Sequence, residues 1–299
     1  MLKVLAWVVS NDNRFLNGAL NILEHQHNGL EVVGVTANNP IQLARNGKIV
    51  PTVPFTEIDE KDYDVLLVFG AQHIGMRKVI KEASRLNFPK EKLLCDWIVC
   101  IPGFTLNKYH HLQRSQLSIF AMHCFGGLMS HLLGLLFRSP FVNMFLNEQD
   151  YLRFLHMPSQ YLEEKLTLKE MKWQADLKFD YPIFMLDDVE IHMNHYSDVA
   201  EAITKWNERK QRINWYNLFV TAYTESKKFL AEFDSLPYGK KVCFVPFKSD
   251  LQSAWYINPA LKKTEQFWRI VNLYAYGDPF YYDPFDMLLY GKKTPLIDM

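Results

Sequence analysis

The first hundred residues alternate between short apolar runs and amphipathic stretches. Apolar runs of strand length cover residues 2–9, 30–37, 64–69 and 92–95, and helical spacing covers residues 15–25 and 74–87. Continuous apolar strands separated by helices are typical of a parallel sheet that is covered on both faces. The pattern predicts a Rossmann-like N-terminal domain over residues 1–103.

The pattern breaks at residues 101–104, Ile-Pro-Gly-Phe, and a second α/β region begins. Strands are predicted over 117–123, 189–195, 218–222 and 241–244, and helices over 128–137, from residue 151 onward, and over 198–212. Ser197 or Asp198 is the expected N-cap of the last helix, with Glu201 three or four residues on. The sequence therefore predicts an α/β protein of two Rossmann-like three-layer domains, 1–103 and 104–299, with mostly parallel sheets.

The last 26 residues, 274–299, are rich in Tyr, Phe, Pro and Asp and show no periodicity. This composition is too aromatic for a disordered segment. We expect an ordered aromatic tail or extended arm.

Composition narrows the classes of partner. Lys and Arg balance Asp and Glu at 33 each, so no net charge indicates nucleic acid or an anionic membrane. No apolar stretch is long enough to span a bilayer, and the N-terminus lacks the features of a signal peptide. The four cysteines form no C-x-x-C pair. We expect a cytoplasmic protein with reduced thiols and no bound metal.

The first strand-to-helix turn does not favour a dinucleotide. Residues 10–15 read Ser-Asn-Asp-Asn-Arg-Phe, with no glycine before Gly18, so the G-x-G-x-x-G fingerprint is absent. Asn11, Asn13 and Arg14 would suit an anion at a helix N-terminus, or form a simple polar turn. The cofactor is unknown.

The second strand-to-helix turn carries more chemistry. His123 and Cys124 precede Gly126 and Gly127 at the start of a helix. Open backbone amides and the helix dipole would bind an anion there and would lower the pKa of Cys124. Alternatively, Cys124 is a small buried residue, and the two glycines permit close packing.

Two further groups are candidates for a site. His195 is expected at the carboxyl edge of the sheet as a general base, or as a buried histidine. His192 lies three residues earlier, on the opposite face of a strand, so the two would not share a metal. Arg209 and Arg212 would neutralise phosphate, or form a solvated helix end, and Asn214 and Asn217 would hold a sugar, or fix a turn.

These segments together resemble a bacterial family of exopolysaccharide biosynthesis proteins of unknown mechanism. The resemblance runs from about residue 115 to residue 247 and rests on the following motifs: 124–127 (Cys-Phe-Gly-Gly), 139–143 (Ser-Pro-Phe-Val-Asn), 195–197 (His-Tyr-Ser), the Trp206, Arg209, Arg212, Asn214 and Asn217 signature, and 233–238 (Phe-Asp-Ser-Leu-Pro-Tyr). Where the family is expected to carry asparagines before the cysteine, this chain has Ala121, Met122 and His123.

The resemblance implies a role in capsule or exopolysaccharide assembly. One hypothesis is a transferase for acyl or glycosyl groups that acts on a sugar nucleotide or lipid-linked saccharide. Cys124 and His195 would be catalytic, and His123, Gly126, Gly127, Arg209, Arg212, Asn214 and Asn217 would bind the substrate or its anionic group. The alternative is a non-catalytic scaffold protein that docks a partner, or a second copy of itself, through its aromatic tail.

Overall fold

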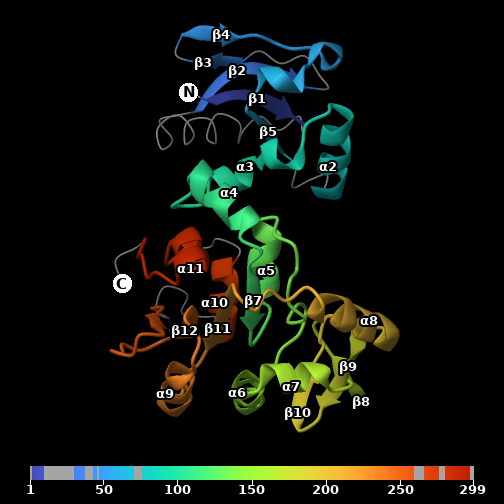
Figure 1. The fold of residues 1–299 in the computed structure, drawn as a ribbon, viewed down its shortest axis with the longest axis vertical. Coiled ribbons are helices and arrows are strands. Elements are labelled where there is room, and N and C mark those ends of the chain that lie inside the picture. Colours follow the sequence, from blue (N-terminus) through green and yellow to red (C-terminus); the bar gives the residue numbers. More distant parts are fainter. Residues whose placement is uncertain are drawn as a thin grey trace. The chain divides into compact units, whose positions relative to one another are not determined.

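The computed structural model describes residues 2–9, 30–37, 43–45, 47–70, 76–258, 266–275 and 280–296. The chain divides into two compact units, Met1–His110 and His111–Met299, so the division falls within α4 (Leu106–Arg114). Figure 1 shows the elements of both. No helix in the described ranges is both long and apolar enough to cross a membrane.

Unit 1 is built on a parallel sheet in the order β2-β1-β5-β6, as the apolar runs predict. Its strands are β1 (Leu2–Val8), β2 (Leu30–Ala37), β5 (Val65–Phe69) and β6 (Leu93–Cys95). All five side chains of β5 are buried, which is why its sequence is continuously apolar. The remaining elements are β3 (Leu43–Arg45), β4 (Lys48–Val50), η1 (Phe55–Glu57), η2 (Glu60–Asp62), α2 (Met76–Arg85), η4 (Lys90–Lys92) and α3 (Asp96–Val99). The predicted helix 15–25 and the turn with Asn11, Asn13 and Arg14 lie outside the described residues.

Unit 2 holds a second parallel sheet in the order β13-β12-β11-β7. Its strands are β7 (Ser118–Ala121), β11 (Leu218–Tyr223), β12 (Lys241–Val245) and β13 (Ala254–Tyr256). The helix α5 (Phe125–Leu132) follows β7 and packs on it, and α10 (Phe267–Ala275) packs on α5, while α9 (Lys227–Ser235) joins β11 to β12 (Figure 1). The two parallel sheets confirm the predicted α/β class.

Unit 2 also contains an antiparallel sheet that the sequence did not predict. Its order is β10-β9-β8, with β8 (Thr167–Gln174), β9 (Phe179–Leu186) and β10 (Val189–His192). Around it lie α6 (Glu148–His156), α7 (Pro158–Glu163) and α8 (Val199–Lys210). Asp198 caps α8 by accepting from the Glu201 amide, as the capping pattern predicts.

The C-terminal aromatic segment is not an exposed arm. Tyr281, Tyr282 and Phe285 are fully buried, and Tyr282 packs on Trp255 of β13 at 4.7 Å between ring centroids. The segment ends in α11 (Pro284–Tyr290), whose C-cap is Gly291 in the left-handed conformation. Burial takes these three rings out of the docking surface that the scaffold hypothesis expects. Phe280 is half-buried, Tyr276 lies outside the described residues, and the Tyr274 side chain is not described, so the scaffold hypothesis stays a prediction.

Candidate functional site

Cys124 lies at the carboxyl edge of the parallel sheet of unit 2. The strand β7 is buried along its length, and its hydrogen bonding to β11 extends one residue further, because the Met122 amide donates to the Thr221 carbonyl (3.1 Å). The chain then turns, and Cys124 becomes the N-cap residue of α5. The carboxyl edge of an open parallel sheet is the place where α/β proteins bind ligands.

His195 lies in a turn just after β10, and its Nε2 is 3.4 Å from the Cys124 Sγ. The thiol is half-buried, whereas His195 has an exposed side. The sequence predicted both residues as catalytic, and the structure brings them within hydrogen-bonding distance. A thiol beside an imidazole is the arrangement of a nucleophile with its base.

A short segment between β7 and β10 brings the two residues together. Phe145 exchanges two backbone hydrogen bonds with His192 (2.9 and 3.0 Å), and the next residue, Leu146, donates to the Met122 carbonyl (2.9 Å). The end of β10 is thereby tied to the end of β7. Since His195 follows β10 and Cys124 follows β7, their side chains meet.

The resting pair is neutral. Burial raises the pKa of the Cys124 thiol to about 11, and the smaller lowering effect of its own backbone amide does not offset this. Burial also lowers the pKa of His195. The sequence predicted a lowered thiol pKa at the helix start, and that prediction is wrong because desolvation outweighs the helix terminus. A neutral imidazole facing a neutral thiol is ready to accept its proton.

His123 and the two glycines have structural roles. His123 is buried, which lowers its pKa to about 3, partly offset by Asn272, so it carries no positive charge at neutral pH. Its Nδ1 accepts from the Phe125 amide (3.2 Å). A Cβ on Gly126 would lie 2.9 Å from Ile119, and a Cβ on Gly127 would lie 3.2 Å from Val142. The glycines therefore let α5 approach its neighbours closely. This agrees with the sequence interpretation in which they permit close packing.

Arg209 supports the turn that carries His195. It is buried in α8, and its Nη1 donates to the Tyr196 hydroxyl (2.7 Å) and to the Val142 carbonyl (3.4 Å). Its guanidinium also lies over the Phe137 ring, 5.3 Å from the centroid. Tyr196 directly follows His195, so Arg209 acts on the site through a neighbour of the histidine. Arg212 is more exposed and pairs with Glu208 at 3.6 Å.

Asn214 and Asn217 lie at the opposite edge of the same sheet from Cys124. The amide of Asn214 donates to Ser118 Oγ (2.8 Å), at the first residue of β7, and Asn217 directly precedes β11. The Asn217 Nδ2 donates to the Ser115 carbonyl (2.7 Å). Strands β7 and β11 are parallel, so both asparagines belong to the amino edge. Their side chains fix the turns there and do not share a site with the thiol.

Three residues around the carboxyl end of β11 were not predicted from the sequence. Tyr223 ends β11, and its ring contacts His123 at 4.6 Å between centroids. Thr224 is buried and hydrogen-bonds through its hydroxyl to Glu148 at the start of α6. For Tyr223 and Thr224 the available signal was their position, because residues at the carboxyl end of a buried parallel strand face the ligand edge. Glu148, at the start of α6, had no such signal.

Tyr223 keeps its proton at neutral pH. Burial raises its pKa to about 12, and the negative charges of Glu148, Glu225 and an ionised Cys124 act in the same direction. The phenol is therefore a hydrogen-bond donor beside the cysteine.

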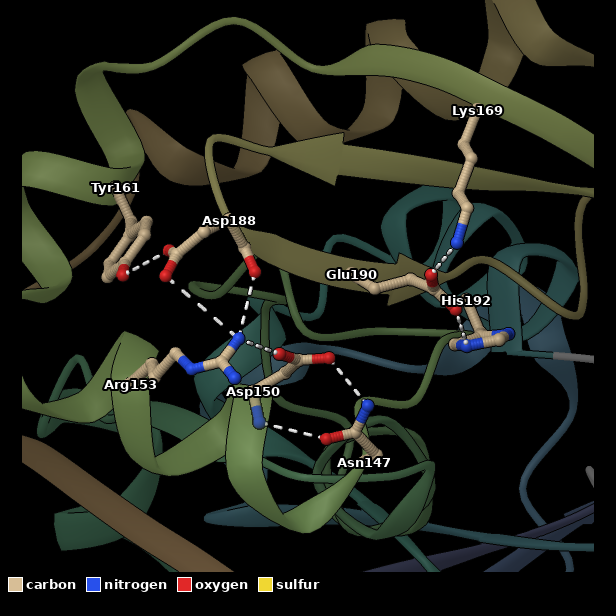
Figure 2. A network of polar contacts seen from close by, with 8 residues as sticks. All are labelled: Asn147, Asp150, Arg153, Tyr161, Lys169, Asp188, Glu190 and His192. Carbon is tan, nitrogen blue, oxygen red and sulfur yellow. Dashed lines mark hydrogen bonds and ion pairs between the residues drawn. The ribbon is translucent and has the colours of Figure 1, made fainter.

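A polar network ties α6 to the antiparallel sheet (Figure 2). Arg153 donates to the Asp150 carboxylate (2.7 Å) and to the Asp188 carbonyl (3.0 Å) in the turn between β9 and β10. Asp188 in turn accepts from the Tyr161 hydroxyl (2.7 Å), and Asn147 caps α6 through the Asp150 amide (2.9 Å). These contacts fix β10, the strand that leads to His195.

His192 belongs to a second part of this network (Figure 2). Its Nε2 lies 2.8 Å from the Glu190 carboxylate, which also binds Lys169, and its ring stacks on Phe145 at 4.4 Å. Burial lowers the pKa of His192, partly offset by Glu190. His192 thus supports the Phe145 segment. Within the described ranges, no three His, Cys, Asp or Glu residues are grouped so as to hold a metal ion.

Fold and site together define an α/β protein with a cysteine–histidine pair on the carboxyl edge of a parallel sheet. Residues 99–291 match the family described as Domain of unknown function (DUF1919), and the chain belongs to that family. It is also similar to an uncharacterized protein of Haemophilus influenzae, with 33% identity over 180 residues, which is 58% of this chain and 84% of the relative. The family match includes both Cys124 and His195.

Proposed function

We propose that the protein is an acyltransferase in which Cys124 is the nucleophile and His195 is the general base. The observation that supports this most directly is the 3.4 Å separation of Cys124 Sγ and His195 Nε2 at the ligand edge of the sheet. Acyl transfer is preferred to glycosyl transfer because a neutral thiol with an adjacent neutral imidazole suits attack on a carbonyl carbon.

The proposed reaction has two steps. In the first, the Cys124 sulfur bonds to the acyl carbon of an activated ester or thioester, and the bond to the leaving group breaks. The thiol proton passes to His195 Nε2 and then to the leaving group. In the second, an acceptor hydroxyl attacks the thioester carbon and its proton passes to His195. The carbon–sulfur bond then breaks, and His195 returns the proton to the sulfur, which restores the thiol and the neutral imidazole.

The acceptor in this proposal is a saccharide of a bacterial capsule or exopolysaccharide. This part rests on the resemblance of residues 115–247 to exopolysaccharide biosynthesis proteins. In a bacterium deleted for the gene, complementation with the wild-type chain should restore the acyl content of the surface polysaccharide, and Cys124→Ala should not. Restoration by Cys124→Ala would exclude the covalent route.

The covalent step can be tested without the natural donor. Incubation with p-nitrophenyl acetate followed by peptide mass mapping should place an acetyl group on Cys124. Cys100→Ala is the matched control, because Cys100 is an exposed cysteine in the other unit and its loss should leave acetylation of Cys124 unchanged. Absence of an adduct on Cys124 would contradict the proposal.

A further inference from the structure

An acyl transfer through Cys124 creates a negative charge that needs a hydrogen-bond donor. Attack on the carbonyl carbon produces a tetrahedral oxyanion, and its stabilisation by fixed donors is a large part of such catalysis. The backbone amide directly after the nucleophile is a common donor. In this chain that amide belongs to Phe125, and it already donates to the His123 Nδ1 at 3.2 Å.

The Tyr223 hydroxyl is a side-chain donor at the same edge. In the parallel register of β7 and β11, Thr221 lies opposite Ala121, so two residues further Tyr223 lies beside His123, the residue before Cys124. Its ring is fixed between His123 (4.6 Å) and Phe267 (6.2 Å). In the described part of the chain, no residue hydrogen-bonds to the Tyr223 hydroxyl, which leaves its proton available.

We infer that Tyr223 is the oxyanion donor of the site and bonds through its hydroxyl to the tetrahedral intermediate formed on Cys124. This inference rests on the proposed acyl transfer. It is supported by the protonation state of Tyr223, because burial and the nearby glutamates keep the phenol neutral up to a pKa of about 12. The role assigned to Tyr223 makes it a catalytic residue and not a structural partner of His123.

Tyr223→Phe tests the inference, because it removes the hydroxyl and keeps the ring contacts with His123 and Phe267. Two probes are compared at one pH. Acetylation of Cys124 by p-nitrophenyl acetate passes through an oxyanion, whereas alkylation by iodoacetamide displaces iodide and forms none. We expect the acetylation rate to fall about 100-fold and the alkylation rate to stay unchanged.

Three results would overturn the inference. If Tyr223→Phe acetylates at the wild-type rate, or if both rates fall by the same factor, the hydroxyl is not an oxyanion donor, while the proposed function still stands. If the wild-type chain forms no acetyl adduct on Cys124, the proposed acyl transfer fails and the inference fails with it. Tyr223→Leu, which removes the ring as well, separates loss of the ring packing from loss of the hydroxyl, since it should slow both reactions.

Discussion

Cys124 and His195 are 71 positions apart in the chain and 3.4 Å apart in the fold. Each was recognisable as a candidate from local features, since the cysteine follows a predicted strand and comes two residues before a pair of glycines, and the histidine ends a predicted strand. Their contact was not predictable, because it depends on the hydrogen bonds of Phe145 and Leu146 to two separate strands. The thiol pKa was predicted in the wrong direction, because local sequence does not report burial.

The raised pKa of Cys124 predicts how its alkylation depends on pH. At neutral pH nearly all of the thiol is protonated, and the thiolate fraction grows about tenfold per pH unit below the pKa. The rate of alkylation of Cys124 by iodoacetamide, followed by peptide mass mapping, should therefore rise continuously toward pH about 11. Fully buried Cys243 is the internal control and should stay unlabelled. A plateau of the Cys124 rate below pH 8 would indicate a resting thiolate and contradict this account.

At the scale of single elements, α5 depends on Gly126 for its close approach to β7. An added Cβ would lie 2.9 Å from Ile119 Cγ2 and 3.0 Å from the Cβ of Ala121, which has no rotamer with which to move away. Gly126→Ala should lower the free energy of unfolding by about 1–2 kcal/mol, because overpacking exceeds the gain in helix propensity. Urea unfolding measures the change. Gly239→Ala is the control, since no atom lies within 4 Å of its new Cβ, and equal midpoints for the two variants would refute the packing role.

The turn before β11 gives a second test at this scale. Asn217 donates to the Ser115 carbonyl (2.7 Å) and accepts from Lys240 Nζ (2.5 Å). Asn217→Ala should reduce the free energy of unfolding by about 2 kcal/mol, because these partners lose their hydrogen bonds. Cys124 of the Asn217→Ala variant should be acetylated at the wild-type rate, since the turn lies at the amino edge of the sheet and Cys124 at the carboxyl edge. The control is Arg212→Ala, which should change the free energy of unfolding by less than about 0.5 kcal/mol, because Arg212 is only half-buried and its ion pair with Glu208 is long (3.6 Å). If Asn217→Ala slowed acetylation of Cys124 and left the free energy of unfolding unchanged, Asn217 would instead bind the substrate.

At the scale of the whole molecule, the sequence predicted parts of the fold with unequal success. The strand β5 is continuously apolar because it is wholly buried, and β1 and β2 are largely apolar because most of their residues are buried or half-buried, so their apolar runs revealed them. The edge strand β8 is almost wholly exposed and mixes Lys and Glu with Leu, Met and Trp, so no periodicity marked it. The aromatic tail lacks a repeat because its rings fill individual gaps against β13, as Tyr282 does beside Trp255.

The central claim is that Cys124 and His195 act as one pair, and His195→Ala tests it most directly. His195 is exposed on one side, so its truncation should leave the free energy of unfolding, measured in urea, within about 0.5 kcal/mol of the wild type. We predict that the rate of acetylation of Cys124 by p-nitrophenyl acetate at neutral pH falls about 100-fold or more, because the thiol has lost the base that takes its proton. An unchanged acetylation rate in a folded His195→Ala variant would contradict the account.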